Sequence, residues 1–435
     1  MLAPAWLDHV ALVGGIEPPA RGDGFAWCDL GCGQGITALI LAASHPAGVF
    51  HGIDAMPAHV GHARCLAAAA GVVNAHFNAV DFAAADLALP RFDYLVAHGV
   101  YSWVDATGRD ALRRFIDRHL APYGLVYISY NAMPGWARDL PFQRLLRRLA
   151  DCADGDGARR VLAAADAIHS LAQEAPALAA SFIAQELRER PEDYPAPYLV
   201  HEFLHPAWQP LYVTEVRADM ATIGLTPVGS ATLIENFDAL VLGEAARARL
   251  AAVADADLRE LVRDYFLDQR FRCDVFARGN RRLDADERRR RLLAGGLALA
   301  RPPTMIRFTA TTARGRIRYD SLAARAIVAA LASGPRVPAD LTADLPGQRD
   351  LLDAVLALCA GGDAVPVEPV GAAVGALNHA MWQRLDGPEE VLWLALPCGT
   401  AVPAERDLLR RLRDGAPIDE RRFPGWSGFL AAHGL

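Results

Sequence analysis

Short apolar runs that alternate with helical segments constrain the fold of this chain more than any other feature of its sequence. Five runs have the length and the aromatic or β-branched content of buried strands, at residues 25–30, 49–53, 72–80, 92–97 and 124–130. Helical patterns separate most of them, at residues 36–43, 57–70 and 109–120. Because parallel strands need long crossovers, this order predicts an α/β fold with a doubly wound parallel sheet.

Glycines, acidic residues and one aromatic residue stand at or just after the ends of the first three of these runs. They are Asp29, Gly31, Gly33, Gly35, Asp54, Asp81 and Phe82. In a doubly wound sheet the ligand lies beyond the carboxyl ends of the strands. Glycines let the backbone approach a ligand and turn into a helix, whose N-terminus favours a carboxylate or a phosphate. Asp54 stands at the distance where a carboxylate binds both ribose hydroxyls.

A nicotinamide dinucleotide is one candidate ligand, because residues 33–38 satisfy the Gly-x-Gly-x-x-Ala fingerprint. Three features favour a nucleoside without a pyrophosphate instead. Asp29 comes just before the glycines, the spacing from Gly31 to Gly35 is tighter, and Asp81 adds a third acidic residue after the third strand.

The order of these motifs resembles that of class I S-adenosylmethionine-dependent methyltransferases, in the runs Asp29-Leu-Gly-Cys-Gly-Gln-Gly35, Gly52-Ile-Asp54 and Asp81-Phe82. The resemblance implies a Rossmann-like sheet with S-adenosyl-L-methionine as its cofactor. It implies that the three loop glycines pack on the methionine moiety and that Asp29 helps to hold its ammonium group. Asp54 would bind the ribose hydroxyls, and Asp81 with the backbone of Phe82 would contact the adenine edge.

A wider resemblance covers most of the chain. The segments at residues 98–104, 130–136, 198–204, 228–237 and 270–276 are similar to methyltransferases that carry a methyltransferase regulatory domain. Bacterial outer-membrane-protein lysine methyltransferases are similar to this group, which implies lysine side chains of a protein as the methyl acceptors. A small-molecule methyltransferase and a non-catalytic regulatory protein that binds S-adenosylmethionine are the alternatives.

Four residues at the ends of the fourth and fifth runs are candidates for catalysis, namely His98, Tyr101, Tyr130 and Asn131. Methyl transfer from a sulfonium is an in-line displacement, so the protein mainly aligns the reacting groups and excludes water. An amine acceptor must also lose a proton, which such side chains could assist. His98 has a second interpretation, in which only its backbone contacts the cofactor.

The remaining sequence predicts three further parts after a cofactor-binding domain at residues 1–138. Residues 139–205 are expected to form a helical insertion that caps the substrate side. Residues 206–300 are expected to complete the sheet and to form the regulatory domain. Residues 301–435 are expected to form an α+β region, in which a hairpin, two helices and a strand resemble a winged-helix module that binds protein.

The run from His201 to His205 matches the His-Glu-x-x-His pattern of zinc proteases. That pattern works on a continuous helix with a third ligand near by. Pro197 and Pro206 leave room for barely two turns. We therefore expect no metal site here.

The composition limits the catalytic mechanisms, the cellular compartment and the partners that the chain can have. All 44 basic residues of the Lys+Arg count are arginine, which excludes every mechanism that needs a lysine amine of the enzyme. Seven scattered cysteines without a Cys-x-x-Cys pair, and a start unlike a signal peptide, indicate a cytoplasmic protein. The net charge of −7 argues against nucleic acid as a partner, and no apolar stretch is long enough to span a bilayer. A homodimer is the oligomeric state that we consider.

Overall fold

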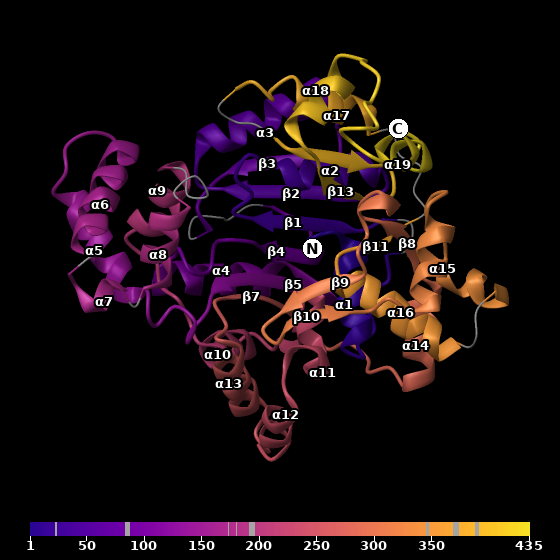
Figure 1. The fold of residues 1–435 in the computed structure, drawn as a ribbon, viewed down its shortest axis with the longest axis horizontal. Coiled ribbons are helices and arrows are strands. Elements are labelled where there is room, and N and C mark those ends of the chain that lie inside the picture. The colour runs from indigo at the N-terminus through magenta and orange to yellow at the C-terminus, as the bar shows by residue number, and fades with distance from the viewer. Residues whose placement is uncertain are drawn as a thin grey trace.

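A seven-stranded sheet forms the centre of the computed structural model, which describes residues 1–21, 24–82, 88–172, 174–179, 181–190, 196–344, 348–368, 374–387 and 391–435 (Figure 1). The strand order is β3-β2-β1-β4-β5-β7-β6. The first five strands are parallel, whereas β7 runs antiparallel to both of its neighbours. The strands are β1 (Ala26–Leu30), β2 (Val49–Asp54), β3 (Ala75–Ala79), β4 (Phe92–Ala97), β5 (Leu120–Asn131), β6 (Thr226–Ser230) and β7 (Phe271–Ala277). This confirms the predicted doubly wound, Rossmann-like α/β sheet.

Alternate residues of the strands serve the two faces of this sheet. Trp27 and Tyr127 belong to a core that includes the helices α1 (Pro4–Val13), α2 (Ile36–Ser44) and α3 (Pro57–Ala70). Cys28 and Ile128 belong to a core on the opposite face, with α4 (Ala106–His119) and α10 (Val213–Ala221). The sheet is therefore buried on both sides, which explains why its strands have nearly continuous apolar sequences.

The third strand is shorter than the sequence pattern predicts. It begins at Ala75 rather than at residue 72. The chain before it is held by Asn74, whose side-chain amide donates to the carbonyl groups of Ala42 (3.1 Å) and Gly48 (2.9 Å). These side-chain bonds tie Asn74 to the turn between α2 and β2, while its carbonyl accepts from the N–H of Phe50 at 2.8 Å just before the strand begins.

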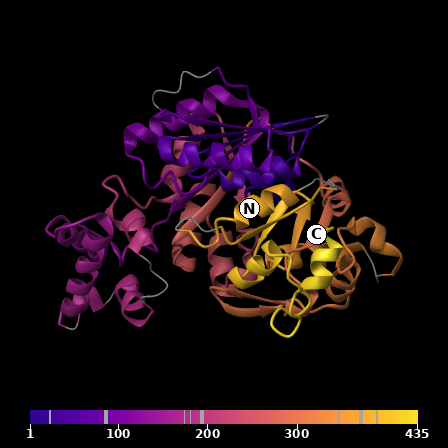
Figure 2. The same ribbon diagram turned by 90° about the horizontal axis from the view of Figure 1, so that it is seen from above.

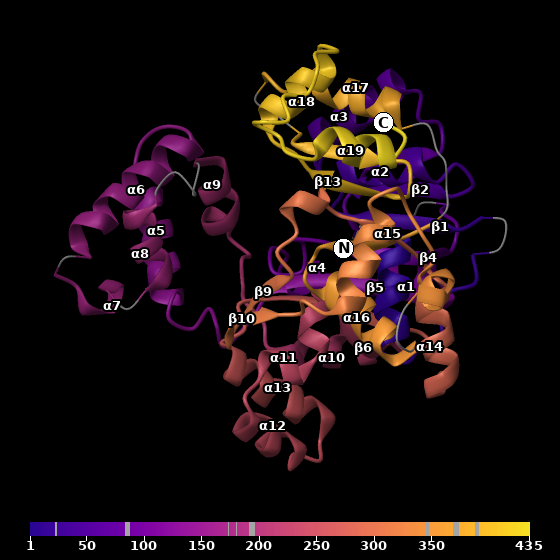
Figure 3. The same ribbon diagram turned by 45° about the vertical axis from the view of Figure 1, so that its right-hand side comes forward.

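Five helices between β5 and α10 form what we call the cap. They are α5 (Leu140–Asp151), α6 (Gly157–Leu171), α7 (Pro176–Ala179), α8 (Phe182–Glu189) and α9 (Ala196–Leu204). Phe142, Val161 and Phe203 are among the residues of the cap's own core. Figure 3 shows the cap standing away from the rest of the molecule, which confirms a helical insertion in the sheet fold.

A helical excursion joins the last two strands of the sheet. It contains the 3₁₀ turn η3 (Leu233–Asn236) and the helices α11 (Asp238–Val241), α12 (Glu244–Ala251) and α13 (Ala256–Leu267). The helix α14 (Ala285–Ala294) follows β7, and its N-cap is Asp284, whose carboxylate accepts from the backbone N–H groups of Asp286 and Glu287.

The C-terminal region is α+β and contains three small antiparallel sheets. Its strands pair as β8 (Gly296–Leu299) with β11 (Ala364–Val367), β9 (Thr309–Thr312) with β10 (Gly315–Arg318), and β12 (Trp393–Leu396) with β13 (Thr400–Pro403). Its helical segments are η4 (Pro303–Met305), α15 (Leu322–Leu331), η5 (Pro338–Asp344), α16 (Gln348–Ala360), α17 (Gly375–Trp382), α18 (Arg406–Arg413) and α19 (Trp426–Ala432). The pairing of β8 with β11 joins residues on both sides of the boundary predicted at residue 300.

The C-terminal region packs directly on the sheet domain. Helix α17 lies against α3, and the β12–β13 hairpin lies against α2. Figure 2 shows this region, in orange and yellow, beside the helices of one face, with the cap set apart from it. Within the described ranges, no helix has both the length and the apolar character that crossing a membrane requires.

Candidate functional site

The loop between β1 and α2 carries three glycines in the left-handed region. Gly31, Gly33 and Gly35 have φ values of +83°, +52° and +73°. A Cβ atom added to Gly35 would lie 2.6 Å from Cβ of Ala63 and from Cε1 of Phe77, so only glycine fits there. A Cβ atom on Gly33 would meet nothing within 4 Å. The loop is therefore packed tightly at its end and open at its middle.

Asp54, at the end of β2, holds this loop in place. Its Oδ2 accepts from the backbone N–H of Gly33 at 2.8 Å, and its Oδ1 accepts from that of Met56 at 2.8 Å. His59 Nδ1 lies 3.3 Å from Oδ1. The structure thus brings Asp54 and the glycine loop together, as the spacing of the motifs predicts.

Asp29 is a buried carboxylate next to the same loop. Its residue is 5% exposed, and the described part of the chain gives its carboxylate no hydrogen-bond donor. Burial, followed by the negative charge of Asp54, raises the pKa of Asp29 to about 7. Such a carboxylate is suited to a cation supplied by a ligand, because an ion pair would offset the cost of its burial.

Asp81 and Phe82 follow β3 at the same edge of the sheet. The N–H of Val80 donates to the carbonyl of Asp54 at 3.0 Å, which joins the two strand ends. Asp81 is exposed, and Phe82 packs against the core on the α4 face. Residues 83–87, which continue this loop, lie outside the described chain.

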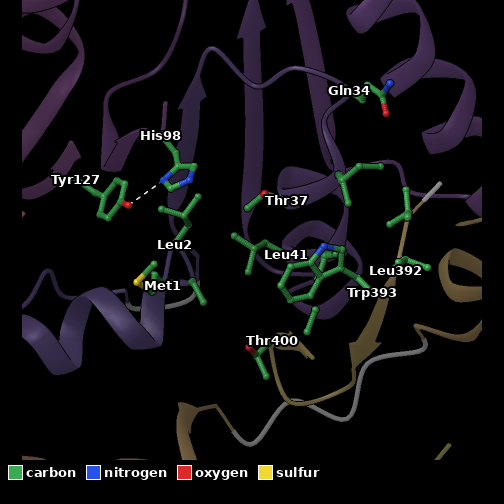
Figure 4. Close-up of a pocket in the computed structure, with 15 residues that line it drawn as sticks. Met1, Leu2, Gln34, Thr37, Leu41, His98, Tyr127, Leu392, Trp393 and Thr400 are labelled. Atoms are coloured by element: carbon green, nitrogen blue, oxygen red, sulfur yellow. Dashed lines mark hydrogen bonds between the residues drawn. The ribbon is translucent and has the colours of Figure 1, made fainter. Parts of the chain in front are cut away.

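A cavity of about 670 Å³ opens beside the N-terminal half of α2. It is lined by Met1, Leu2, Ala3, Gln34, Ile36, Thr37, Ile40, Leu41, His98, Tyr127, Val391, Leu392, Trp393, Thr400 and Ala401. Figure 4 shows His98 and Tyr127 on one side of it and Trp393 with Leu392 on the other. Most of the lining is apolar, and of the described residues that line it none is acidic.

His98 lies directly after β4 and reaches this cavity. Its Nδ1 is 2.9 Å from the Tyr127 hydroxyl and 3.2 Å from Oγ of Ser129. Desolvation, followed by the positive charge of the Met1 amino group, lowers the pKa of His98. The imidazole is therefore neutral near pH 7, as a proton acceptor must be.

The other three catalytic candidates do not line this cavity. The Tyr101 hydroxyl donates to Asp219 at 2.6 Å, and the Tyr130 hydroxyl donates to Asp274 at 2.6 Å. Burial raises the pKa of both tyrosines above the usual value. Asn131 instead donates through Nδ2 to Oε1 of Glu202 at 2.8 Å, a buried bond between β5 and the cap.

The His-Glu-x-x-His segment directs its side chains to separate contacts. His201 stacks on Trp103 with ring centroids 5.5 Å apart. Glu202 bonds to Asn131, and His205, beyond the end of α9, accepts from the N–H of Ala207 at 3.2 Å. In the described ranges no three His, Cys, Asp or Glu residues come together as metal ligands.

Sequence reasoning missed Tyr127, Ser129 and Trp393 as parts of this site. Tyr127 and Ser129 could have been found, because two-residue periodicity places them together on one face of β5. Trp393 could not, because it lies almost 300 residues after His98 and stands in no motif.

Comparisons with known proteins agree with this architecture. A model described as a methyltransferase domain matches residues 28–124, and one described as a predicted methyltransferase regulatory domain matches residues 195–278. An uncharacterized protein of Synechocystis sp. is 33% identical over 347 residues, which are 79% of this chain and 68% of that protein. An uncharacterized protein of Rickettsia prowazekii is 31% identical over 133 residues, which are 31% of this chain and 53% of that protein.

A solved structure shares the fold of nearly the whole chain. PKMT2 from Rickettsia typhi, in complex with AdoHcy, matches with a TM-score of 0.71 at 16% sequence identity. The match covers 99% of this chain and 89% of that one.

Proposed function

Because the chain belongs to the family of S-adenosylmethionine-dependent methyltransferases that carry a methyltransferase regulatory domain, we propose that it methylates lysine side chains of a protein. S-adenosylmethionine supplies a methyl group that is already activated on a sulfonium. The tasks left to the chain are to bind this cofactor, to align the acceptor with it and to receive a proton.

The observation that carries the proposal is the pair of aspartates around the open glycine loop. The Asp54 carboxylate accepts from the backbone N–H of Gly33 in the loop. It would also accept hydrogen bonds from the ribose hydroxyls. Asp29 is buried and would take the ammonium group of the methionine moiety. The space above Gly33 leaves room for that moiety. We further propose that Asp81 and the Phe82 backbone border the adenine and that His98 serves the reaction.

The cavity next to His98 supports an amine on an aliphatic chain as the acceptor. Its mostly apolar lining suits an aliphatic side chain, and the lack of an acidic side chain among its described lining favours a neutral amine over an ammonium. The PKMT2 likeness concerns the fold, so the protein acceptor rests on the resemblance and on this cavity. We also propose that the chain divides into a cofactor domain, the cap, a regulatory domain and a C-terminal region.

Incubation with methyl-labelled S-adenosylmethionine and a cell lysate tests the proposal. We expect label in protein bands and, after hydrolysis, in methylated lysine. The enzyme itself contains no lysine, so its own band gives a clean background. Asp54→Ala should abolish labelling, whereas Asp117→Ala, at an exposed ion pair with Arg278, should not.

Two other outcomes would overturn the proposal. Label in a small extractable product would replace the protein acceptor with a small molecule. Cofactor binding in calorimetry without any labelling would favour a regulatory protein that binds S-adenosylmethionine.

A further inference from the structure

A chain of hydrogen bonds leads from β7 to the imidazole of His98. The Tyr127 hydroxyl donates to Sγ of Cys273 at 3.1 Å. A phenol has one proton to donate, so the Tyr127 oxygen acts as an acceptor toward its other neighbours. The nearest of these is Nδ1 of His98 at 2.9 Å.

Ser129 completes the chain from the same face of β5. Its Oγ accepts from the N–H of Gly99 at 2.8 Å, so its hydroxyl proton remains to be donated. The Ser129 oxygen lies 3.2 Å from Nδ1 of His98, farther than the Tyr127 oxygen at 2.9 Å. Because the Tyr127 proton is used on Cys273, Nδ1 of His98 is the donor in the shorter of these two contacts.

From this geometry we infer that Tyr127 is a positioning residue that keeps the proton of neutral His98 on Nδ1 and leaves Nε2 as a free acceptor toward the cavity. The inference rests on the proposed function and deepens it. Nε2 has no partner within the part of the chain that the structure describes. Figure 4 shows the bond between Tyr127 and one ring nitrogen, with the ring at the cavity wall.

Few of the groups around His98 gain or lose a proton near pH 7. Burial raises the pKa of the Tyr127 hydroxyl well above its usual value and that of the Cys273 thiol to about 11, so both stay neutral near pH 7. Phe271 packs against the ring at 6.1 Å between centroids and carries no charge. The Met1 amino group also titrates near by, with its pKa lowered by burial to about 6.

The proton balance of the step follows from this arrangement. An acceptor ammonium gives one proton to Nε2 of His98 and becomes a neutral amine. Its nitrogen then forms the new bond to the methyl carbon while the carbon–sulfur bond of the donor breaks. The positive charge of the sulfonium passes to the methylated amine, and the imidazolium returns its proton to solvent.

The tautomer can be measured without any turnover. In protein with ¹⁵N-labelled histidine, long-range ¹H–¹⁵N spectra distinguish a protonated from an unprotonated ring nitrogen. The signals absent from His98→Asn identify His98 among the 13 histidines. We expect Nδ1 to be protonated in the wild type and the two tautomers to mix in Tyr127→Phe. A matched control is Tyr94→Phe, which removes a buried hydroxyl bonded to Asp8 and should leave the His98 signals unchanged.

Kinetics connect the tautomer to the reaction. His98→Asn keeps a donor for Tyr127 but lacks Nε2, and should lower kcat by about 10²–10⁴-fold. Tyr127→Phe should lower kcat by about 10-fold or more with unchanged affinity for S-adenosylmethionine. It should also move the acidic limb of the pH profile to lower pH, because the Tyr127 oxygen stabilises the imidazolium more than the neutral ring.

Two results would overturn the inference. One is a wild-type spectrum with the proton on Nε2, and the other is a Tyr127→Phe variant whose tautomer and pH profile match those of the wild type. Failure of the proposed function has a different signature. The free protein would then show the expected tautomer but bind no cofactor or label no protein.

Discussion

At the residue scale, the buried carboxylate of Asp29 makes cofactor binding depend on pH. Its pKa of about 7 means that the ionised form, which pairs with an ammonium group, is depleted at lower pH. We expect the affinity for S-adenosylmethionine to fall by about 10-fold from pH 8 to pH 6. Calorimetry at the two values measures this. Asp29→Asn should bind more weakly and lose the dependence, and a variant that keeps the slope would assign it to another group.

The same carboxylate should lower the stability of the cofactor-free protein at alkaline pH. Its pKa in the folded state lies above the usual aspartate value of about 3.8, so the stability that it contributes is full below about pH 4. That contribution is lost as pH rises through about 7. Asp29→Asn should therefore raise the free energy of unfolding by about 1–3 kcal/mol at pH 8 and change it little at pH 4. Urea titrations at both pH values check the sign.

Substitutions at two glycines of one loop should have different effects on the stability of the fold and on cofactor binding. Gly35→Ala places a Cβ atom 2.6 Å from Ala63 and from Phe77 at a positive φ, and should cost about 2–4 kcal/mol of stability. Gly33→Ala meets open space and should cost about 1 kcal/mol while it obstructs the cofactor. Thermal unfolding and calorimetry measure the two effects. Equal losses of stability in both variants would contradict this division.

At the element scale, the buried carboxylate of Asp139 is one of the links between the cap and the sheet. Asp139 is fully buried and accepts from Arg270 Nη1 at 2.6 Å, from the Ser181 hydroxyl at 2.6 Å and from the N–H of Ile183 at 3.1 Å. Asp139→Asn should loosen α8 by about 1–3 kcal/mol, because Arg270 loses its charged partner. Hydrogen exchange should rise in α8 and not in β4. The same substitution at Asp151, in an exposed pair with Arg160, is the control.

The sequence predicts the elements of the sheet better than it predicts the side chains of the site. Apolar runs and glycine turns mark the strands locally, so Asp29, Asp54 and the loop glycines were found together. Which side chains of a strand reach the cavity depends on their exact position, because successive side chains point to opposite faces of the sheet. Tyr130 faces the α4 core, whereas Tyr127, three positions earlier on β5, faces the cavity. Contacts across long stretches of sequence, such as that of Trp393, leave no local pattern.

At the scale of the whole molecule, the sheet domain and the C-terminal region share one hydrophobic core. Residues of α1 and α2 belong to the same cluster as residues of α15, α16 and the β12–β13 hairpin. Arg384 of the C-terminal region lies with Nη1 2.7 Å from Nε2 of His62 on α3. Strand β8 pairs with β11 across the predicted boundary. The winged-helix order stays a prediction, but this core makes the region part of the folding unit.

We therefore expect the full chain to unfold in one cooperative transition outside the cap, seen alike by circular dichroism and by tryptophan fluorescence. Removal of residues 301–435 should leave a fragment that binds a hydrophobic dye and lacks affinity for S-adenosylmethionine, because the faces of α1 and α2 become exposed. Replacement of residues 141–203 by a short Gly-Ser linker is the control, since the cap has its own core. That variant should keep cofactor affinity. A fragment of residues 1–300 with wild-type affinity would show that the C-terminal region is an independent domain. The cavity wall around Trp393 would then contact the acceptor without stabilising the rest of the fold.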